Sequence, residues 1–381
     1  MKTTHSLQIK TFSKIIAASL AVSLLSGPAF SQSYTAFDIG TLGGTGTVAT
    51  AINASGQVTG SSDTADGLSH AFITKFNGRD ISDLGAFSGG DKSSGLGINA
   101  KGQVVGEANG TYQGLIVTRA FISGPNGTNL ATLTDWNDSK GVAINDSGQA
   151  VGSVSNILFP SGSGAFVTEP NGILATELGG MKGSSNVATD INASGQVVGY
   201  ANITSSLYRH AFITSPNHVF VSDLGSLGGY DSAATGINDS GKVVGYSWLS
   251  PFGAIHAFIT DVNSSMTDLG TLGGQSSYAY DINSTGQVVG RSNTADGSAF
   301  HAFITGPDGI GMTDINDLVK LENGAFLVSA TGINDIGQII TNASDGHAYL
   351  LSPIPEPETY AMLLAGLGII GCFVRRRKFV V

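Results

Sequence analysis

The chain has little cysteine, proline or charge. Among its 381 residues are one Cys, Cys372, and 10 Pro, and only 12% of the residues are Asp, Glu, Lys or Arg. Because Cys372 lies near the C-terminus, the preceding chain can form no internal disulfide bond and offers no thiolate for catalysis or metal binding. The low Pro content excludes a collagen-like triple helix. Low charge combined with 41% hydrophobic residues excludes a disordered chain.

Positive charge is scarce between residues 32 and 352. This stretch contains 11 Lys and Arg against 26 Asp and Glu, a net charge of −15, whereas the whole chain carries −10. Nucleic acids and anionic membranes are bound mainly through clustered Lys and Arg. We therefore expect no nucleic-acid partner.

Glycine, in contrast, is abundant, with 54 residues. Each Gly inside a helix costs about 1 kcal/mol relative to Ala, so this content disfavours a helical bundle. It indicates an all-β protein with many turns.

Residues 1–31 have the layout of a secretory signal peptide. Lys2, Lys10 and Lys14 precede an apolar run from Ile15 to Leu25, and small residues stand before a cleavage point at Gln32. The alternative is a membrane anchor, but 11 helical residues extend only about 16 Å against a bilayer core of about 30 Å. We expect export.

Residues 353–381 form a second sorting element. An apolar segment, residues 361–374, lies between two marks: Pro355, Glu356 and Pro357 before it, and Arg375, Arg376 and Arg377 with Lys378 after it. The basic residues should stay on the cytoplasmic side, so this element would hold an exported chain at the inner membrane, at least transiently. The ending resembles the PEP-CTERM sorting signal of Gram-negative bacteria. That resemblance implies an exosortase-type processing enzyme as partner and a surface or extracellular location; the alternative is a permanent anchor.

The region between these ends, residues 32–352, is a repeat. The pattern Ile-Asn-x-x-Gly recurs at intervals of 45 to 51 residues, at Ile52, Ile98, Ile144, Ile191, Ile237, Ile282 and Ile333. His-Ala-Phe-Ile-Thr or a degenerate form follows in every unit, with His at positions 70, 210, 256, 301 and 347. The third mark is an acid followed by Leu or Ile and usually Gly, at Asp38, Asp83, Glu177, Asp223, Asp268 and Asp314.

Each unit predicts four short strands, exemplified by residues 49–53, 57–60 and 70–74 and a strand ending at Gly85. Four strands in about 46 residues fit a propeller blade, and seven units fit the usual four to eight blades. We predict an all-β, seven-bladed β-propeller-like domain, with a β-solenoid as the alternative. The acidic mark, which comes last in each unit, already stands at Asp38, before the first Ile-Asn-x-x-Gly pattern. The seventh unit lacks this acidic mark at its end. We therefore favour a seventh blade shared between the two ends over seven complete, independent units.

The three marks together resemble the HAF-repeat family of extracellular proteins, from about residue 34 to residue 352. Arg119 and Gly164 replace His in units two and three. The resemblance implies a propeller-like fold and no established catalytic activity.

No residue is predicted to be catalytic, to bind a cofactor or to bind a metal. The histidines and the acids recur about once per unit and would lie around a ring, whereas metal ligands must surround one point. We expect the histidines to make hydrogen bonds within each blade, and the acids to accept backbone N–H groups at strand ends. Residues 63–67 and 293–297 resemble fragments of calcium loops but are better explained as hairpin turns; weak Ca²⁺ binding stays possible.

Two functions remain open at this point. The first is a non-enzymatic binding or structural module of the cell surface, matrix or biofilm, with an exopolysaccharide as a plausible ligand. The alternative is a polysaccharide-active hydrolase or lyase, which would need polar residues unique to one or two blades. The most divergent segments are the first places to look: Tyr112 and Gln113, Trp136 to Asp138, and Lys320 to Phe326.

Overall fold

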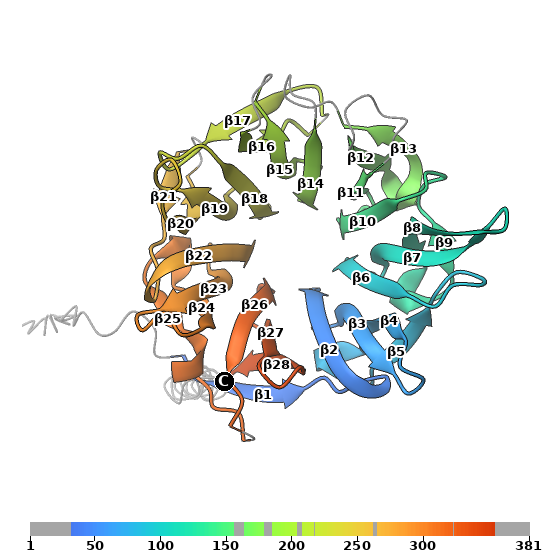
Figure 1. Cartoon of the computed structure of the whole chain (residues 1–381), viewed down its shortest axis with the longest axis horizontal. Coiled ribbons are helices and arrows are strands. Elements are labelled where there is room, and N and C mark those ends of the chain that lie inside the picture. Colours follow the sequence, from blue (N-terminus) through green and yellow to red (C-terminus); the bar gives the residue numbers. More distant parts are fainter. Residues whose placement is uncertain are drawn as a thin grey trace, which may run out of the picture.

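A computed structural model of the chain describes residues 32–155, 164–178, 185–203, 208–216, 218–261, 265–322 and 324–354. Within these ranges the chain forms seven four-stranded antiparallel sheets arranged as blades around a central channel (Figure 1). The prediction of a seven-bladed all-β propeller is confirmed, and the closed ring excludes a solenoid.

The blades follow one another along the chain, each running from an inner to an outer strand. Blade 1 contains β2 (Gly43–Ile52), β3 (Val58–Thr64), β4 (Ser69–Ile73) and β5 (Ser82–Gly85). Blade 2 contains β6 (Ser93–Ile98), β7 (Val104–Tyr112), β8 (Leu115–Ser123) and β9 (Leu130–Thr132). Blade 3 contains β10 (Ser139–Ile144), β11 (Ala150–Val154), β12 (Gly164–Glu169) and β13 (Ile173–Glu177). Blade 4 contains β14 (Asn186–Ile191), β15 (Val197–Asn202), β16 (Arg209–Thr214) and β17 (Val221–Gly225).

The remaining blades complete the ring. Blade 5 contains β18 (Ser232–Ile237), β19 (Val243–Trp248), β20 (Ile255–Thr260) and β21 (Met266–Asp268). Blade 6 contains β22 (Gly273–Ile282), β23 (Val288–Thr294), β24 (Phe300–Thr305) and β25 (Met312–Asp314). Blade 7 contains β26 (Leu327–Ile333), β27 (Ile339–Ala343) and β28 (Ala348–Pro353) from the C-terminal side, with β1 (Tyr34–Asp38) as its outer strand. Within the described ranges, short 3₁₀ turns η1 to η5 lie at Phe76–Gly78, Pro125–Gly127, Pro170–Gly172, Pro307–Gly309 and Ile315–Asp317.

The seventh blade joins the two ends of the ring. Strand β1 pairs antiparallel with β28, with Ala36 opposite Leu351 and Asp38 opposite Tyr349 (Figure 1). The shared blade favoured from the sequence is therefore confirmed.

The hydrophobic core is divided among the junctions between blades. Among the described residues are seven clusters of buried side chains, and each contains residues from two adjacent blades. Both faces of every blade are covered in this way, so Ala71, Phe72 and Ile73 of one His-Ala-Phe-Ile-Thr segment are all buried. Burial on both faces explains why so few charges occur in the strands.

A repeated Gly and a repeated Phe depend on each other in the blades. Gly60 of β3 lies opposite Phe72 of β4, and a Cβ atom at Gly60 would stand 1.9 Å from the carbonyl oxygen of Val48. The missing side chain lets the inner strand approach and leaves room for the fully buried Phe72 ring. The same Gly–Phe register occurs in blades 1 to 6.

Candidate functional site

The repeated histidines and acids form pairs on the outer half of the blades. His70 Nδ1 lies 2.9 Å from Asp83 Oδ2, and His256 Nδ1 lies 2.9 Å from Asp268. His210–Asp223 and His301–Asp314 repeat this contact, and His347 contacts Asp38 across the junction of the two chain ends. The expectation of a hydrogen bond within each blade is confirmed for all five histidines.

The acids also hold the turn that follows them. Asp83 Oδ1 accepts the N–H of Gly85 at 2.6 Å, and the equivalent bonds form at Asp38, Asp223, Asp268 and Asp314. The predicted role of a strand-end acid is therefore confirmed for these five. Within the described part of the chain, no group of three or more His, Cys, Asp or Glu residues is placed to hold a metal ion.

The predicted calcium-like segments are hairpin turns. Gly67 N–H donates to Thr64 O, and Gly297 N–H donates to Thr294 O, which closes each turn between the second and third strands of a blade. Hydrogen bonds from Thr294 and Ser298 lower the pKa of Asp296 to about 2. The carboxylate of Asp296 is thus charged and bonded to its own turn.

The inner ends of the blades carry a ring of asparagines. The Asn of each Ile-Asn-x-x-Gly pattern donates its side-chain N–H to the main-chain oxygen of the equivalent Asn in the next blade, at 2.9 to 3.5 Å. The ring contains Asn53, Asn99, Asn145, Asn192, Asn238, Asn283 and Asn334. In most blades the same side chain also bonds the Gln four residues later, as Asn53 does with Gln57 at 3.0 Å. The sequence suggested only a local turn, so the contact between blades is a further finding.

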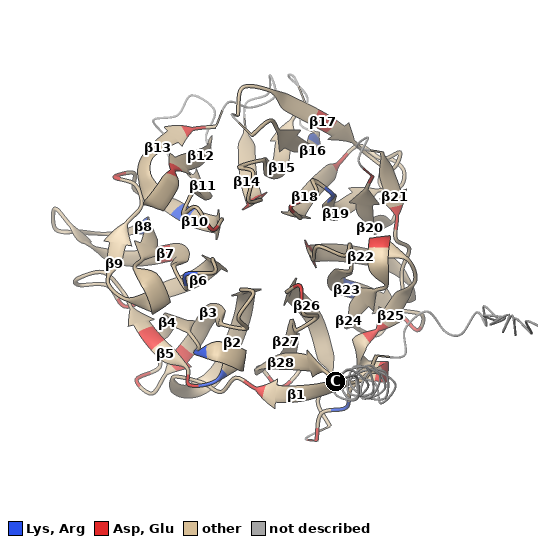
Figure 2. Cartoon of the chain, turned by 180° about the vertical axis from the view of Figure 1, so that it is seen from behind, with Lys and Arg blue, Asp and Glu red and all other residues tan. Residues whose placement is uncertain are grey.

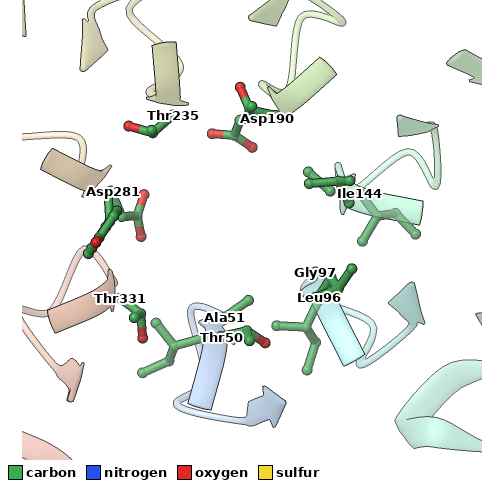
Figure 3. A pocket seen from close by; sticks show the side chains of 15 residues that line it. Thr50, Ala51, Leu96, Gly97, Ile144, Asp190, Thr235, Asp281 and Thr331 are labelled. Carbon is green, nitrogen blue, oxygen red and sulfur yellow. The ribbon is translucent and has the colours of Figure 1, made fainter. Parts of the chain in front are cut away.

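The channel has two acidic side chains that break the repeat. The residue before Ile-Asn is Asp190 in blade 4 and Asp281 in blade 6. The other five blades have a small residue there: Ala51, Gly97, Ala143, Gly236 and Gly332. Both carboxyl groups project toward the channel (Figure 3). This position is not among the shared marks of the repeat, although the seven units differ visibly there.

The two carboxyl groups connect neighbouring blades. Asp190 accepts the N–H of Ile191 at 2.8 Å through Oδ1 and that of Ile237, in the next blade, at 2.9 Å through Oδ2. Asp281 does the same with Ile282 at 2.7 Å and with Ile333 at 2.9 Å. Each aspartate therefore joins its own inner strand to the next one.

Their surroundings favour the protonated form. Burial among the inner strands, followed by the nearby charge of Asp281, raises the pKa of Asp190 from 3.8 to about 7. Burial raises the pKa of Asp281 to about 6, although hydrogen bonds from Ile333 and Ile282 oppose the shift. A titrating pair in a channel is a pattern found at functional sites and at structural contacts alike.

A cavity of about 230 Å³ contains this pair together with Thr235 and Tyr280. Around it, each inner strand has a register shift, which turns one extra residue toward the channel: Thr50, Leu96, Val142, Thr189, Thr235, Tyr280 and Thr331. Acidic positions are visible at the ends of several inner strands, while Lys and Arg are sparse (Figure 2). We refer to Asp190, Asp281, Thr235 and Tyr280 as the channel site.

The divergent segments proposed from the sequence do not form one site. Tyr112 lies against Arg119, whose guanidinium carbon is 4.0 Å from the ring centroid, and Arg119 Nε donates to Asn137 at 2.9 Å. This contact brings the blade 2 and blade 3 segments together at the junction of those blades. Lys320 lines a separate cavity beside β1, so it does not join them. The sorting residues Pro355, Glu356, Pro357, Arg375, Arg376 and Arg377, and residues 1–31, lie outside the described residues.

Comparison with known proteins identifies the ending of the chain. The family described as PEP-CTERM protein-sorting motif matches residues 353–378. This motif indicates export and is the sorting signal that exosortase recognises. The described residues contain no helix that is long and apolar enough to cross a membrane. The chain is thus an exported protein with a seven-bladed β-propeller.

Solved structures share the fold at low sequence identity. An acylaminoacyl peptidase from Pyrococcus horikoshii matches with a TM-score of 0.53 and 9% identity, over 86% of this chain and 55% of that chain. A catalytically inactive virginiamycin B lyase from Staphylococcus aureus matches with a TM-score of 0.51 and 10% identity, over 84% of this chain and 100% of that chain. The propeller domain of the Trilobed protease from Pyrococcus furiosus has a TM-score of 0.46, 12% identity, and coverage of 69% and 84%. This chain spans about half of the peptidase, and the likenesses to the peptidase and the lyase show the fold alone. No curated protein matches the sequence.

Proposed function

We propose that this protein is a non-enzymatic binding or structural module at the cell surface or in the extracellular matrix of a biofilm. In this proposal residues 1–31 are a signal peptide, an exosortase-type enzyme processes the C-terminal tail, and the HAF-like repeats build the exported body. No cofactor is required, although weak Ca²⁺ binding at the acidic hairpins is compatible with it.

One observation carries the non-enzymatic assignment. The repeated His and Asp side chains, which are the recurring acid–base groups of the chain, pair with each other at intervals around the ring, as His70 with Asp83 and His256 with Asp268 do. Acid–base catalysis requires such groups to converge on one reacting bond. Their distribution serves blade stability and leaves the surfaces of the ring for binding.

The test combines location with chemistry. Cells that express the protein are separated into membrane, surface-matrix and medium fractions, and the purified protein is incubated with extracted matrix polysaccharide. We expect the protein in the matrix or surface fraction and no release of reducing sugar. Retention in the inner membrane alone, or catalytic release of sugar, would overturn the proposal.

The channel site favours a second candidate, a polysaccharide hydrolase or lyase. Asp190 and Asp281 occur in only two of seven blades, and their raised pKa values suit proton transfer near neutral pH. Both carboxyl groups already accept two backbone N–H groups, which supports a structural role. If the protein releases sugar, Asp190→Asn and Asp281→Asn decide whether this pair is responsible; Asp66→Asn, at an exposed hairpin, is the control.

A further inference from the structure

An exposed group of aromatic side chains lies where blades 4 and 5 meet. It contains Tyr208 from the end of the β15–β16 connection, Tyr230 from the β17–β18 connection, and Trp248 and Phe252 at and after the end of β19. Tyr208 and Tyr230 are stacked, with ring centroids 4.3 Å apart and an interplanar angle of 21°. Phe252 stands edge-on to Tyr230 at 5.9 Å and to Trp248 at 6.5 Å. We call these four residues the aromatic platform.

The platform faces solvent. Tyr208 is 41% exposed, Tyr230 is 40% exposed and Phe252 is 82% exposed. Exposed apolar groups gathered in one place usually mark an interaction surface, whereas isolated ones do not. Burial in the core therefore does not account for these rings.

The equivalent positions in blades 1 and 6 carry no aromatic side chains. Gly229, next to Tyr230, packs so closely on Trp248 that a Cβ atom would lie 2.3 Å from its Cβ. Blades 1 and 6 have the same close approach. A Cβ atom at Gly44 would lie 2.5 Å from the Cβ of Asp63, and one at Gly274 would lie 2.5 Å from the Cβ of Asn293. The residues that correspond to Tyr230 there are Thr45 and Gln275. The equivalent positions in blades 1 and 6 thus carry polar residues, whereas this junction has two aromatic ones.

Hydrogen bonds tie together the described residues that flank these rings. Arg209 N–H donates to Asp231 Oδ1 at 2.6 Å, which ties the segment after Tyr208 to the one after Tyr230. Gly229 N–H donates to Trp248 O at 2.8 Å, and Trp248 N–H donates to Asp231 O at 3.0 Å. The rings are therefore presented by a fixed framework, which lowers the entropy lost on binding.

Phe252 is held in a backbone conformation that a bulky residue rarely adopts. Its φ is 61°, in a turn closed by a hydrogen bond from Gly253 N–H to Ser250 O. Pro251 precedes Phe252, and a turn with Pro followed by positive φ ordinarily has Gly or Asn at the second place. Strained backbone of this kind is found at binding and catalytic sites, so the conformation of Phe252 is compatible with a binding role.

The size and chemistry of the platform point to one kind of partner. If each whole side chain offers about 200 Å², the three exposed rings present roughly 300 Å², well below the about 800 Å² that each protein contributes to a standard interface. The negative faces of aromatic rings attract the slightly positive C–H groups on one face of a sugar ring, because the ring quadrupole is negative above the plane. The net charge of −15 between residues 32 and 352 favours a neutral sugar over an anionic polymer or an anionic membrane.

We propose that the aromatic platform binds sugar rings of a neutral polysaccharide by stacking. This inference rests on the proposed function and names the ligand class and the surface for it. Sugar rings of one chain would contact the exposed rings of Tyr208, Tyr230 and Phe252, with Trp248 packed edge-on against Phe252.

The platform contains its own optical probe. The chain has two Trp residues, Trp248 and Trp136, and Trp136 packs against Phe166 in blade 3. In a Trp136→Phe variant of the exported protein, the fluorescence therefore reports on Trp248 alone. We expect a saturable change when laminarin, a neutral glucan, or a neutral mannan is titrated. Calorimetric titration of the protein with Trp136 intact gives the same affinity without relying on that variant.

Two truncations and a matched control test the assignment. Phe252→Ala and Tyr230→Ala should each weaken binding of the recognised polysaccharide about tenfold, the effect of losing about 1.4 kcal/mol of stacking. Phe220→Ala removes an aromatic ring that is 71% exposed but lies in the β16–β17 connection, at the other end of the strands, and should leave the affinity unchanged.

The outcomes separate this inference from the proposed function. Unchanged affinity in both truncated variants, or no binding to any neutral polysaccharide, overturns the platform assignment. In either case a protein that stays in the matrix fraction and releases no sugar still satisfies the proposed function. A third outcome also overturns the inference: the protein binds no glycan, but it binds phosphatidylcholine vesicles or associates with itself, and Phe252→Ala abolishes that binding. The platform would then belong to a membrane contact or to a contact with a second copy of the chain.

Discussion

The side-chain amide of Asn334 donates a hydrogen bond to the main-chain oxygen of Asn53, 281 residues earlier in the sequence, at 3.2 Å. This bond is the last link of the asparagine ring, and it joins blade 7 to blade 1. A motif that forms a local turn therefore also connects each blade to the next. The ring makes the inner ends of the blades depend on one another.

The first prediction concerns this ring. Asn99 is 2% exposed and bonds Gln103 and the main-chain oxygen of Asn145, while its own oxygen accepts two N–H groups. Asn99→Ala leaves these groups without partners, so we expect the free energy of unfolding to fall by about 2 to 4 kcal/mol. Chemical denaturation measures it. Lys101→Ala, an exposed change in the same turn, should have little effect; equal losses in the two variants would contradict the role of the ring.

The second prediction concerns the junction of the chain ends. A protein that begins at Gly40 lacks β1 and leaves the outer edge of β28 unpaired, which should lower its thermal stability and promote aggregation. A synthetic peptide of residues 32–39 should restore stability in proportion to its concentration, because it binds only the folded ring. The same peptide with its sequence scrambled is the control, and equal rescue by both peptides would show that strand pairing is not responsible.

The third prediction concerns pH. The pKa of Asp190 rises from 3.8 to about 7 on folding, and that of Asp281 to about 6, so between pH 4 and pH 7 the folded protein binds more protons than the unfolded chain. The stability that these two groups contribute is fully present below pH 4 and is lost as the pH rises through their folded values. The free energy of unfolding falls by up to about 1.4 kcal/mol per pH unit for each carboxyl group, the value reached where the folded and unfolded states differ by a full proton.

Neutral variants test this slope. Asp190→Asn and Asp281→Asn should each flatten the decline between pH 4 and pH 7, even where the lost hydrogen bond lowers stability at every pH. The free energy of unfolding is measured by urea denaturation across this range. Asp66→Asn controls for the change in net charge; an unaltered pH profile in both channel variants would refute the prediction.

The fourth prediction contrasts two phenylalanines of blade 5. Phe258 is fully buried between blades, so Phe258→Ala should cost about 3 to 5 kcal/mol in the free energy of unfolding. Phe252 is 82% exposed, so Phe252→Ala should change stability by less than about 0.5 kcal/mol. Thermal denaturation compares the two variants, and a large loss from Phe252→Ala would indicate a structural role for the platform.

The recurring features of the molecule were predictable from the sequence. Repeats fix the register of residues such as Gly60 and Phe72, and seven equivalent units of four strands have few ways to bury both faces of every sheet. A hydrogen bond within the blade was predicted for His70, but its partner was not: it is Asp83, on the adjacent outer strand.

The features that depart from the repeat were not predictable in the same way. Asp190 and Asp281 occupy a position where the other units have Ala or Gly. A search for residues that all units share does not find this position. The aromatic platform collects residues from three connections of two blades. Only the way one blade packs on the next brings Tyr208, Tyr230 and Phe252 together.

The pairing of β1 with β28 also sets an order of assembly in time. Blades 1 to 6 consist of contiguous stretches and can form as the chain is produced, whereas the seventh needs β1 from the start of the domain and β28, which ends at Pro353. The sorting motif begins at residue 353, where β28 ends. The ring therefore cannot close before the chain has been made up to the start of its sorting signal.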